Sequence, residues 1–449
     1  MRYLYRSLYC QCTALLMYVF IHTCSPVTAH SLSDALVAAY LNNPDLESAR
    51  LLLRSTEESL TIARSGYLPI ISIAGTAAFA NQTESSSPAQ NMMFPKYASG
   101  TRLVLKQPIF DAKTRYLVKK SIAEINAQRE ALREAEQMTL YSTAVAFGDV
   151  LEKMAAVELS KSSMRFLKAR IRAARQGFEV GQGSRTEIAQ ADTHYQKETM
   201  RLHGSTAALI ASKARLQQMT GIKAEDLTSV LSLEKILPTS LEDSLESAME
   251  NNPSVVKAMY SLEVLKQVVN AQDSSWIPSV GLEGSAGYVR DDLWFLPNNE
   301  TSTVGTASIG ITVMLPLYAG GRISAEKRKT RALLESARSQ LISKRNTVQQ
   351  QVISSWSALK AAKASFSAAK AAISSAEIAL DSVMKEHSVG QRSLLEVLDA
   401  RSRFENAHAN LAAAKQRHLV ASFALAMGTG CLSLSNLGIE ITPSLLQKN

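Results

Sequence analysis

The sequence predicts a mainly α-helical fold with a membrane β-barrel portion, built as a tandem duplication of one unit. Three observations predict it: motifs that occur twice at one offset, pairs of short segments in which apolar and polar residues alternate, and very long segments without proline. The chain has 449 residues, of which 46% are hydrophobic, and this composition is typical of an ordered protein.

Residues 1–29 have the pattern of a secretory signal peptide. Arg2 and Arg6 precede an apolar stretch, and a Val-Thr-Ala triplet that ends at Ala29 supplies a cleavage site. The mature chain of an exported protein is therefore expected to begin near His30.

The cysteines and the charges narrow the possible functions. Of the four cysteines only Cys431 lies beyond the leader, so no disulfide can form within the mature chain. Lipidation of Cys24 is an alternative processing route, although Thr23 before it is not the usual small residue. The net charge of +9 is spread without a basic block, which argues against nucleic acid as a partner.

No apolar run after the leader approaches the roughly 18 residues that a membrane-spanning helix needs. If this protein crosses a membrane, it must therefore use strands.

One unit of the sequence occurs twice. The motifs that recur at one offset are Asn42-Asn43-Pro44 as Asn251-Asn252-Pro253, Gly181 as Gly390, and Thr220-Gly221 as Thr429-Gly430. The offset slips by one residue near Pro108 and Pro316. A duplication therefore divides the mature chain into a first repeat over 30–239 and a second repeat over 240–449.

Each repeat is expected to open with two helices, over 31–66 in the first and 240–275 in the second. Ser31 and Ser240 are residues suited to cap the first helix of each pair. The Asn-Asn-Pro triplet separates the two helices, because proline fits a first helical turn and disfavours helix in the residue before it.

Alternation predicts two strands in each repeat. They cover 70–80, 100–109, 279–290 and 304–315. In the second repeat, the apolar faces consist of Val280, Leu282, Gly284, Ala286 and Tyr288, and of Ala307, Ile309, Ile311, Val313 and Leu315. Polar loops are expected over 81–99 and 291–303. Strands of about ten residues with one apolar and one polar face are typical of a transmembrane barrel.

Aromatic residues mark the ends of these strands. Tyr67 and Trp276 precede the first strand of each pair, and Phe110 and Tyr318 follow the second. Ordinary packing at a domain junction is one interpretation. The occurrence of the same placement in both repeats favours the other, an aromatic girdle at a membrane interface.

Long helical hairpins are predicted over 111–220 and 320–428, followed by a short C-terminal tail. At about 1.5 Å per residue, a helix as long as the first half of each hairpin is a rod of roughly 100 Å. In the second hairpin, seven-residue steps select Val352, Leu359, Phe366, Ile373 and Leu380, then Val397, Phe404, Leu411, His418 and Leu425. Such seams predict antiparallel coiled coils whose tips are the turns after Val180 and Val389.

Four strands are too few to close a membrane barrel, so the missing strands must come from other copies of the chain. Here the sequence resembles the TolC family of outer-membrane efflux ducts. The resemblance rests on the duplicated unit, on Asn-Asn-Pro followed by Tyr67-Leu68-Pro69, and on the stretch from Ser388 to Ala400.

The resemblance implies a homotrimer in the outer membrane that extends into the periplasm. Twelve strands would form one barrel in contact with lipid, and the helices would form a tunnel that narrows at the helical tips. Family members are docked by a periplasmic adaptor and an inner-membrane transporter, and they export small molecules or proteins. In this chain the tips that would contact the adaptor are Val180, Gly181, Val389 and Gly390.

The resemblance also implies a gate at the tips. The family positions of the aperture fall on Thr186, Glu187, His387, Arg392, Glu396 and Asp399. Arg392 matches an arginine whose bonds to the neighbouring turn, here Thr186 and Glu187, hold the aperture shut, and Glu396 and Asp399 match a ring of acids. The chain departs from the family at His387, where tyrosine is usual, and at Glu187 and Glu396, where aspartate is usual.

No enzyme is expected from the sequence. His194 and His203 lack metal-site spacing, and no catalytic triad, cofactor motif or phosphate-binding loop is present in the sequence. His418, on an apolar seam, is expected to be a packing or pore-facing residue. A soluble periplasmic coiled-coil scaffold or adaptor, whose strands form a small sheet, is the alternative function.

Overall fold

The computed structural model describes residues 31–85, 91–181, 183–223, 227, 233, 236–293 and 301–439. The predicted signal peptide and Cys24 lie outside the described residues. The chain divides into two compact units, each of which draws on both repeats. The strand unit comprises Ala49–Leu132 and Pro253–Asn346, and the hairpin unit comprises the described residues up to Ser48, those of Arg133–Asn252 and those from Thr347 onward.

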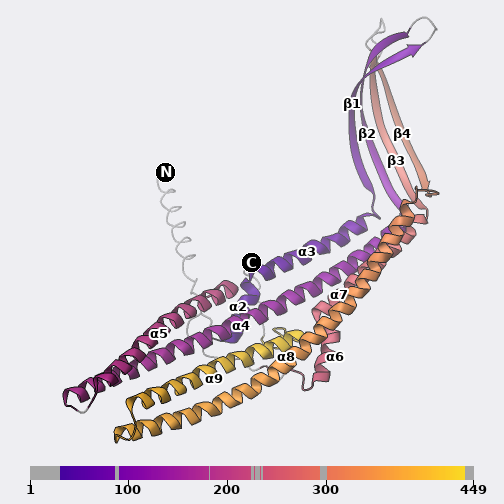
Figure 1. The fold of residues 1–449 in the computed structure, drawn as a ribbon. Helices are drawn as coiled ribbons and strands as arrows, with labels where there is room; N and C mark the ends of the chain where they lie inside the picture. Colours follow the sequence, from indigo (N-terminus) through magenta and orange to yellow (C-terminus); the bar gives the residue numbers. More distant parts are fainter. Residues whose placement is uncertain are drawn as a thin grey trace, which may run out of the picture. The chain divides into compact units, whose positions relative to one another are not determined.

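The strand unit contains one antiparallel sheet of four strands in the order β1-β2-β3-β4 (Figure 1). The strands are β1 (Ile70–Ser85), β2 (Asn91–Phe110), β3 (Ser279–Leu293) and β4 (Thr301–Met314). The central pair joins the two repeats, because β2 of the first is hydrogen-bonded to β3 of the second. β1 and β4 are therefore the edge strands of the sheet.

The register places the predicted apolar residues on one face of the sheet. Ile73 is opposite Leu103 and Gly284 is opposite Ile309, and Leu105 on β2 is opposite Gly284 on β3. This face is not covered within the chain, since Ile73 and Ile309 are each 74% exposed. An exposed apolar face of this extent marks a surface made for lipid or for another protein.

The strands are longer than the alternation predicts. The predicted loop over 81–99 is instead largely strand, since the β1–β2 ladder continues through Ser85 and Asn91. In the sequence, β1 ends in a polar run, Asn81-Gln82-Thr83-Glu84-Ser85, and β2 begins with a mostly apolar run, Met92-Met93-Phe94-Pro95, so neither segment alternates. Phe79 and Tyr97, opposite each other with ring centroids 4.9 Å apart, support the register where this extension begins.

The strand unit also contains the helices that precede and follow the strands along the chain. They are most of α3 (Pro44–Ser65), the first part of α4 (Ala112–Glu179), α7 (Pro253–Asp273), the short 3-10 helix η1 (Ser274–Trp276) and the first part of α8 (Arg322–Ser388). The predicted helices over 31–66 and 240–275 are each divided at the Asn-Asn-Pro triplet, as the proline rule requires.

The hairpin unit contains α2 (Leu32–Asn42), α5 (Arg185–Thr220), α6 (Leu241–Asn251), α9 (Leu394–Gly428) and the remaining lengths of α4 and α8. α4 and α5 form one antiparallel hairpin, and α8 and α9 form the other (Figure 1). The core of the hairpin unit is built around Phe147 and Phe423, which are fully buried with Leu32, Leu36 and Leu140. None of the helices within the described ranges is both long enough and apolar enough to cross a lipid bilayer.

The duplicated Asn-Asn-Pro and Thr-Gly motifs meet in space. In the first repeat the amide of Asn42 donates to the carbonyl of Thr220 at 3.0 Å, and in the second that of Asn252 donates to Gly428 at 2.8 Å. Each contact joins the short first helix of a repeat to the end of its returning helix. The motifs therefore recur because they close the base of each hairpin.

We expect Gly430→Ala to destabilise the hairpin unit by at least about 2 kcal/mol. Gly430 has φ of +77°, and an added Cβ would lie 2.4 Å from the carbonyl oxygen of Asn251. Thermal unfolding monitored by circular dichroism measures the effect. Gly438→Ala is the matched control, since Gly438 has φ of +70° but no atom within 4 Å of the added Cβ. Equal unfolding temperatures for the two variants would contradict the prediction.

Candidate gate at the hairpin tips

The tip of the first hairpin is a short turn between α4 and α5. Gly181 has φ of +77°, a conformation that favours glycine. Ser184 caps α5: its hydroxyl accepts from the backbone N–H of Glu187 at 3.2 Å, and its own N–H donates to the Glu187 carboxylate at 3.4 Å. The carboxylate of Glu187 is thereby held close to its own helix N-terminus.

The tip of the second hairpin repeats this construction. Gly390 has φ of +79°, and the N–H and hydroxyl of Ser393 donate to Oε2 of Glu396 at 2.8 and 3.0 Å. The backbone N–H of Glu396 donates back to the Ser393 hydroxyl at 3.4 Å. Two copies of one capping box therefore start the returning helices α5 and α9.

Arg392 bridges the two sides of the second tip. Its Nε donates to Oε2 of Glu386 at the end of α8, and its Nη1 donates to Oε1 of Glu396 at the start of α9, both at 2.7 Å. The two carboxylates raise the pKa of Arg392, with Glu396 the larger cause. The arginine thus links the end of one helix to the beginning of the next across the turn.

Glu396 is fixed as an anion. The backbone N–H of Ser393, then the guanidinium of Arg392, lower the pKa of Glu396 to about 2, because both donate hydrogen bonds to the charged form. One oxygen accepts from Ser393 and the other from Arg392. The carboxylate therefore stays ionised and oriented far into the acidic range.

Two further predicted gate residues lie beside this bridge. Nδ1 of His387 lies 2.8 Å from the carbonyl oxygen of Arg392, which ties the end of α8 to the turn. Asp399 is one helical turn beyond Glu396, exposed, and accepts from Arg403 at 3.3 Å. His387, Arg392 and Glu396 thus form one connected group, with Asp399 next to it on α9.

The other two predicted gate residues, Thr186 and Glu187, lie on the first tip, at the start of α5. Within the described part of the chain, the partners of the Arg392 side chain are those of its own hairpin. A bond from Arg392 to Thr186 or Glu187 was predicted for neighbouring turns in an assembly, and it remains a prediction.

Sequence reasoning missed Glu386 and the two capping serines. Glu386 lies six residues before Arg392, a spacing that pairs side chains only when a turn folds the chain back on itself. The serines could have been found, because Ser184 and Ser393 each stand three residues before a glutamate at a helix start.

A small apolar cluster lies just behind the tips. Leu394 and Leu398 of α9 are buried with Leu167 of α4 and Ala191 of α5. The cluster packs the first turns of the second returning helix against the first hairpin, so the second tip has a defined position relative to the first.

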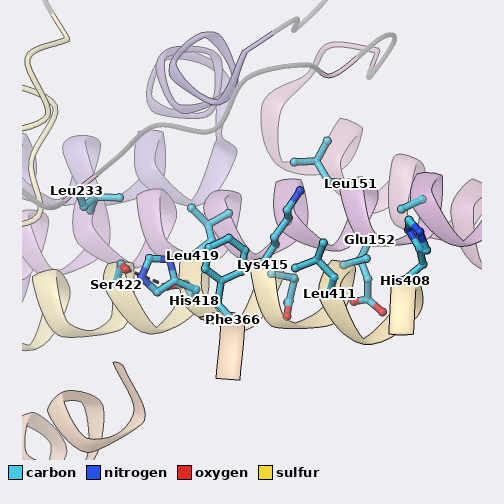
Figure 2. Close-up of a pocket in the computed structure, with 14 residues that line it drawn as sticks. Leu151, Glu152, Leu233, Phe366, His408, Leu411, Lys415, His418, Leu419 and Ser422 are labelled. Atoms are coloured by element: carbon cyan, nitrogen blue, oxygen red, sulfur yellow. Dashed lines mark hydrogen bonds between the residues drawn. The ribbon is translucent and has the colours of Figure 1, made fainter. Parts of the chain in front are cut away.

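A cavity of about 630 Å³ lies farther along α9. Figure 2 shows its lining by side chains of α4 and α9, with Phe366 of α8 and Leu233. His418, which the sequence predicted to be a packing or pore-facing residue, lies here with its ring nearly parallel to that of Phe366 and 6.1 Å from it. Among the described residues, no group of three or more His, Cys, Asp or Glu side chains could hold a metal ion.

A duplicated chain of long helical hairpins, with a sheet whose apolar face and edges are exposed, belongs to the class of outer-membrane channel subunits. The family described as "Outer membrane efflux protein" matches residues 35–222 and 244–430, one match in each repeat. The chain belongs to this family, and the predicted resemblance is confirmed.

Named relatives agree with this assignment. Outer membrane efflux protein BepC of Brucella suis is 32% identical over 415 residues, covering 92% of this chain and 88% of BepC. Outer membrane protein TolC of Escherichia coli is 25% identical over 422 residues, covering 91% of this chain and 84% of TolC.

The fold is also that of solved outer-membrane channels. The Campylobacter jejuni CmeC channel has a TM-score of 0.76 at 18% identity, and the match covers 89% of this chain and 85% of the CmeC chain. Vibrio cholerae VceC has a TM-score of 0.73 at 19% identity, and the match covers 89% of this chain and 96% of the VceC chain. The predicted fold class, outer-membrane location and efflux function are confirmed. The family and these neighbours are channel proteins rather than enzymes.

Proposed function

We propose that three copies of the chain form one channel-tunnel whose aperture lies at the hairpin tips. The main support for this proposal is the sheet. Its four strands have an exposed apolar face and two unpaired edges, β1 and β4, and an open edge cannot face lipid. Pairing β4 of one copy with β1 of the next removes every edge and closes a barrel of the family's type.

The tips are the proposed docking points for a periplasmic adaptor that joins the channel to an inner-membrane transporter. Val180 is 71% exposed and Val389 is 70% exposed at the ends of the two hairpins. A Cβ added to Gly181 or Gly390 would meet no atom within 4 Å, so the backbone there is open to a partner. Exposed apolar side chains beside accessible backbone suit a protein contact.

The gate is proposed to consist of Thr186, Glu187, His387, Arg392, Glu396 and Asp399. Around a threefold axis, Glu396 and Asp399 supply carboxylates that repel one another and attract cations. Arg392 neutralises part of this charge and pins the turn. The pairs are exposed, and exposed pairs contribute little each, so an adaptor can displace them. We assign the chain no enzymatic activity, no cofactor and no nucleic-acid partner.

Fractionation of cells that produce the protein tests the proposal. We expect it to sediment with outer membranes, to need detergent for extraction and to have the mass of a trimer by light scattering in detergent. Release by osmotic shock as a soluble protein would contradict the channel and would favour the periplasmic scaffold. A deletion strain then distinguishes cargoes, through its antibiotic sensitivity and the proteins of its culture supernatant.

A further inference from the structure

Four charged side chains join the two hairpins behind the tips. We call Glu198, Arg201, Arg401 and Glu405 the inter-hairpin cluster. Nε of Arg201 donates to Glu198 at 2.9 Å within α5, and Nε of Arg401 donates to Glu405 at 2.8 Å within α9. Nη2 of Arg201 lies 3.4 Å from Oε2 of Glu405, which connects the two pairs across the hairpins.

The two carboxylates of the inter-hairpin cluster are buried. Glu198 is 6% exposed and Glu405 is 5% exposed. Glu405 accepts from Arg401 with one oxygen and from Arg201 with the other. If the hairpins separated here, Glu405 would keep Arg401 of its own helix but would lose Arg201 of α5. Losing one partner of a buried charge is unfavourable, because the charge is then only partly compensated.

α4 completes the inter-hairpin cluster. Arg401 donates to the Ser162 hydroxyl at 3.2 Å, and Arg201 donates to the Ser160 hydroxyl at 3.3 Å. The guanidinium of Arg401 also lies 5.0 Å from the ring centroid of Phe166 and 5.5 Å from that of Phe404. Cation–π contacts of this kind are strongest where water is excluded. Three helices, α4, α5 and α9, are thus tied at one level.

The ion pairs at the tips are exposed, unlike the carboxylates of the inter-hairpin cluster. Arg392, Glu386 and Glu396 are all exposed, and water and salt weaken exposed pairs. Between these pairs and the inter-hairpin cluster, the small apolar cluster around Leu394 and Leu398 joins the hairpins. The exposed ion pairs therefore lie at the tips, and the buried charged contacts lie behind them, beyond the small apolar cluster.

We propose that the inter-hairpin cluster is the pivot of the gate. This inference rests on the proposed function, in which the tips open. The inter-hairpin cluster keeps α9 seated on α4 and α5 in both states, and only the part of the second hairpin between the cluster and the tip moves. Arg401 and Glu405 are therefore positioning residues for gating, without contact with the aperture.

Hydrogen exchange on the assembled protein in detergent tests the pivot directly. We compare the wild type with Arg392→Ser, the variant expected to open the tips. Peptides that cover 394–400 should exchange faster in the variant, whereas peptides that cover 401–412 should keep the wild-type rate. Faster exchange over 401–412 as well would overturn the pivot, because the inter-hairpin cluster would then separate on opening. An Arg392→Ser variant with unchanged conductance and exchange overturns the proposed gate, and the pivot with it.

The variant Glu405→Gln tests the pivot by changing the inter-hairpin cluster itself. It removes the charge that pairs with Arg201 and Arg401, and we expect exchange over 401–412 to rise about tenfold or more. In planar bilayers the single resting conductance should become a set of levels, since the second hairpin is no longer held at one place. Glu158→Gln is the matched control, because Glu158 forms an exposed pair with Arg165 on the same stretch of α4.

If Glu405→Gln does not assemble, Arg401→Lys provides the measurement. Lysine keeps the charge but cannot reach Glu405 and Ser162 with one planar fork. We expect the same change in conductance levels, smaller in size. A lower unfolding temperature together with one wild-type conductance level would overturn the pivot, since that is the result of a purely structural role.

Discussion

Arg392→Ser is expected to raise the resting single-channel conductance of the reconstituted protein several-fold. Serine cannot bridge Glu386 and Glu396, so the turn loses the link between the end of α8 and the start of α9. Both carboxylates are then left without a neutralising charge, and in a ring of three copies they repel one another. Recordings in planar bilayers at fixed voltage measure the effect.

The control for this experiment is Lys385→Ser. Lys385 is also a cation near the second tip, but its partner, Asp381, lies on the same helix, so the pair does not cross the turn. We expect wild-type conductance from this control. If Arg392→Ser matched the control, Arg392 would have no role in holding the aperture closed.

The partner of Arg392 in the assembly can be identified in the same way. Glu187→Ala should also raise the conductance if Arg392 binds the neighbouring first tip, as the family resemblance implies. A wild-type conductance for Glu187→Ala, together with a raised conductance for Arg392→Ser, would mean that the contacts to Glu386 and Glu396 alone hold the gate.

The second large effect concerns block by divalent cations. Replacing Glu396 and Asp399 together by alanine should abolish the block from the periplasmic side and raise the inhibitory concentration more than tenfold. Carboxylates gathered around an axis concentrate cations, and a divalent ion interacts with them more strongly than a monovalent one. Current at increasing divalent-ion concentration gives the inhibitory concentration, with Asp381→Ala as the control that retains the block.

The pH dependence of this block follows from Glu396. Its pKa is lowered to about 2 by Ser393 and Arg392, so the carboxylate stays charged as the pH falls below its ordinary range. The stabilisation from these hydrogen bonds is fully present above the unfolded pKa and is lost as the pH falls through about 2. Block should therefore persist at pH 4 in the Asp399→Ala variant. Loss of block between pH 5 and pH 4 in that variant would show an ordinary carboxylate at the constriction.

Much of the fold could be predicted from the sequence because the duplication shows each element twice. The Asn-Asn-Pro motif predicted the boundary between two helices in both copies, and alternation over 279–290 predicted the apolar face that the register places on one side of the sheet. The outer parts of β1 and β2 were not predictable, since apolar and polar residues do not alternate over 81–85 and 91–96, whereas the ladder of backbone hydrogen bonds continues through them.

The candidate site was predictable only in part. Glu396 and Asp399 follow a glycine turn at a helix start, a local signal, whereas the contact of Arg392 with Glu386 depends on how the turn folds. The inter-hairpin cluster gave no signal, because Arg201 and Glu405 are separated by 204 positions and meet only through tertiary packing. Long-range pairs of this kind are set by the tertiary fold and leave no pattern in the local sequence.

The two free edges of the sheet have a consequence for inheritance. If β4 of each copy must pair with β1 of another, subunits made from two different alleles enter the same ring without discrimination, because the pairing uses backbone atoms. A cell that carries one normal and one Arg392→Ser allele would then contain few channels of purely normal composition. A leaky gate should therefore behave as a genetically dominant trait, whereas a subunit that fails to fold should be recessive.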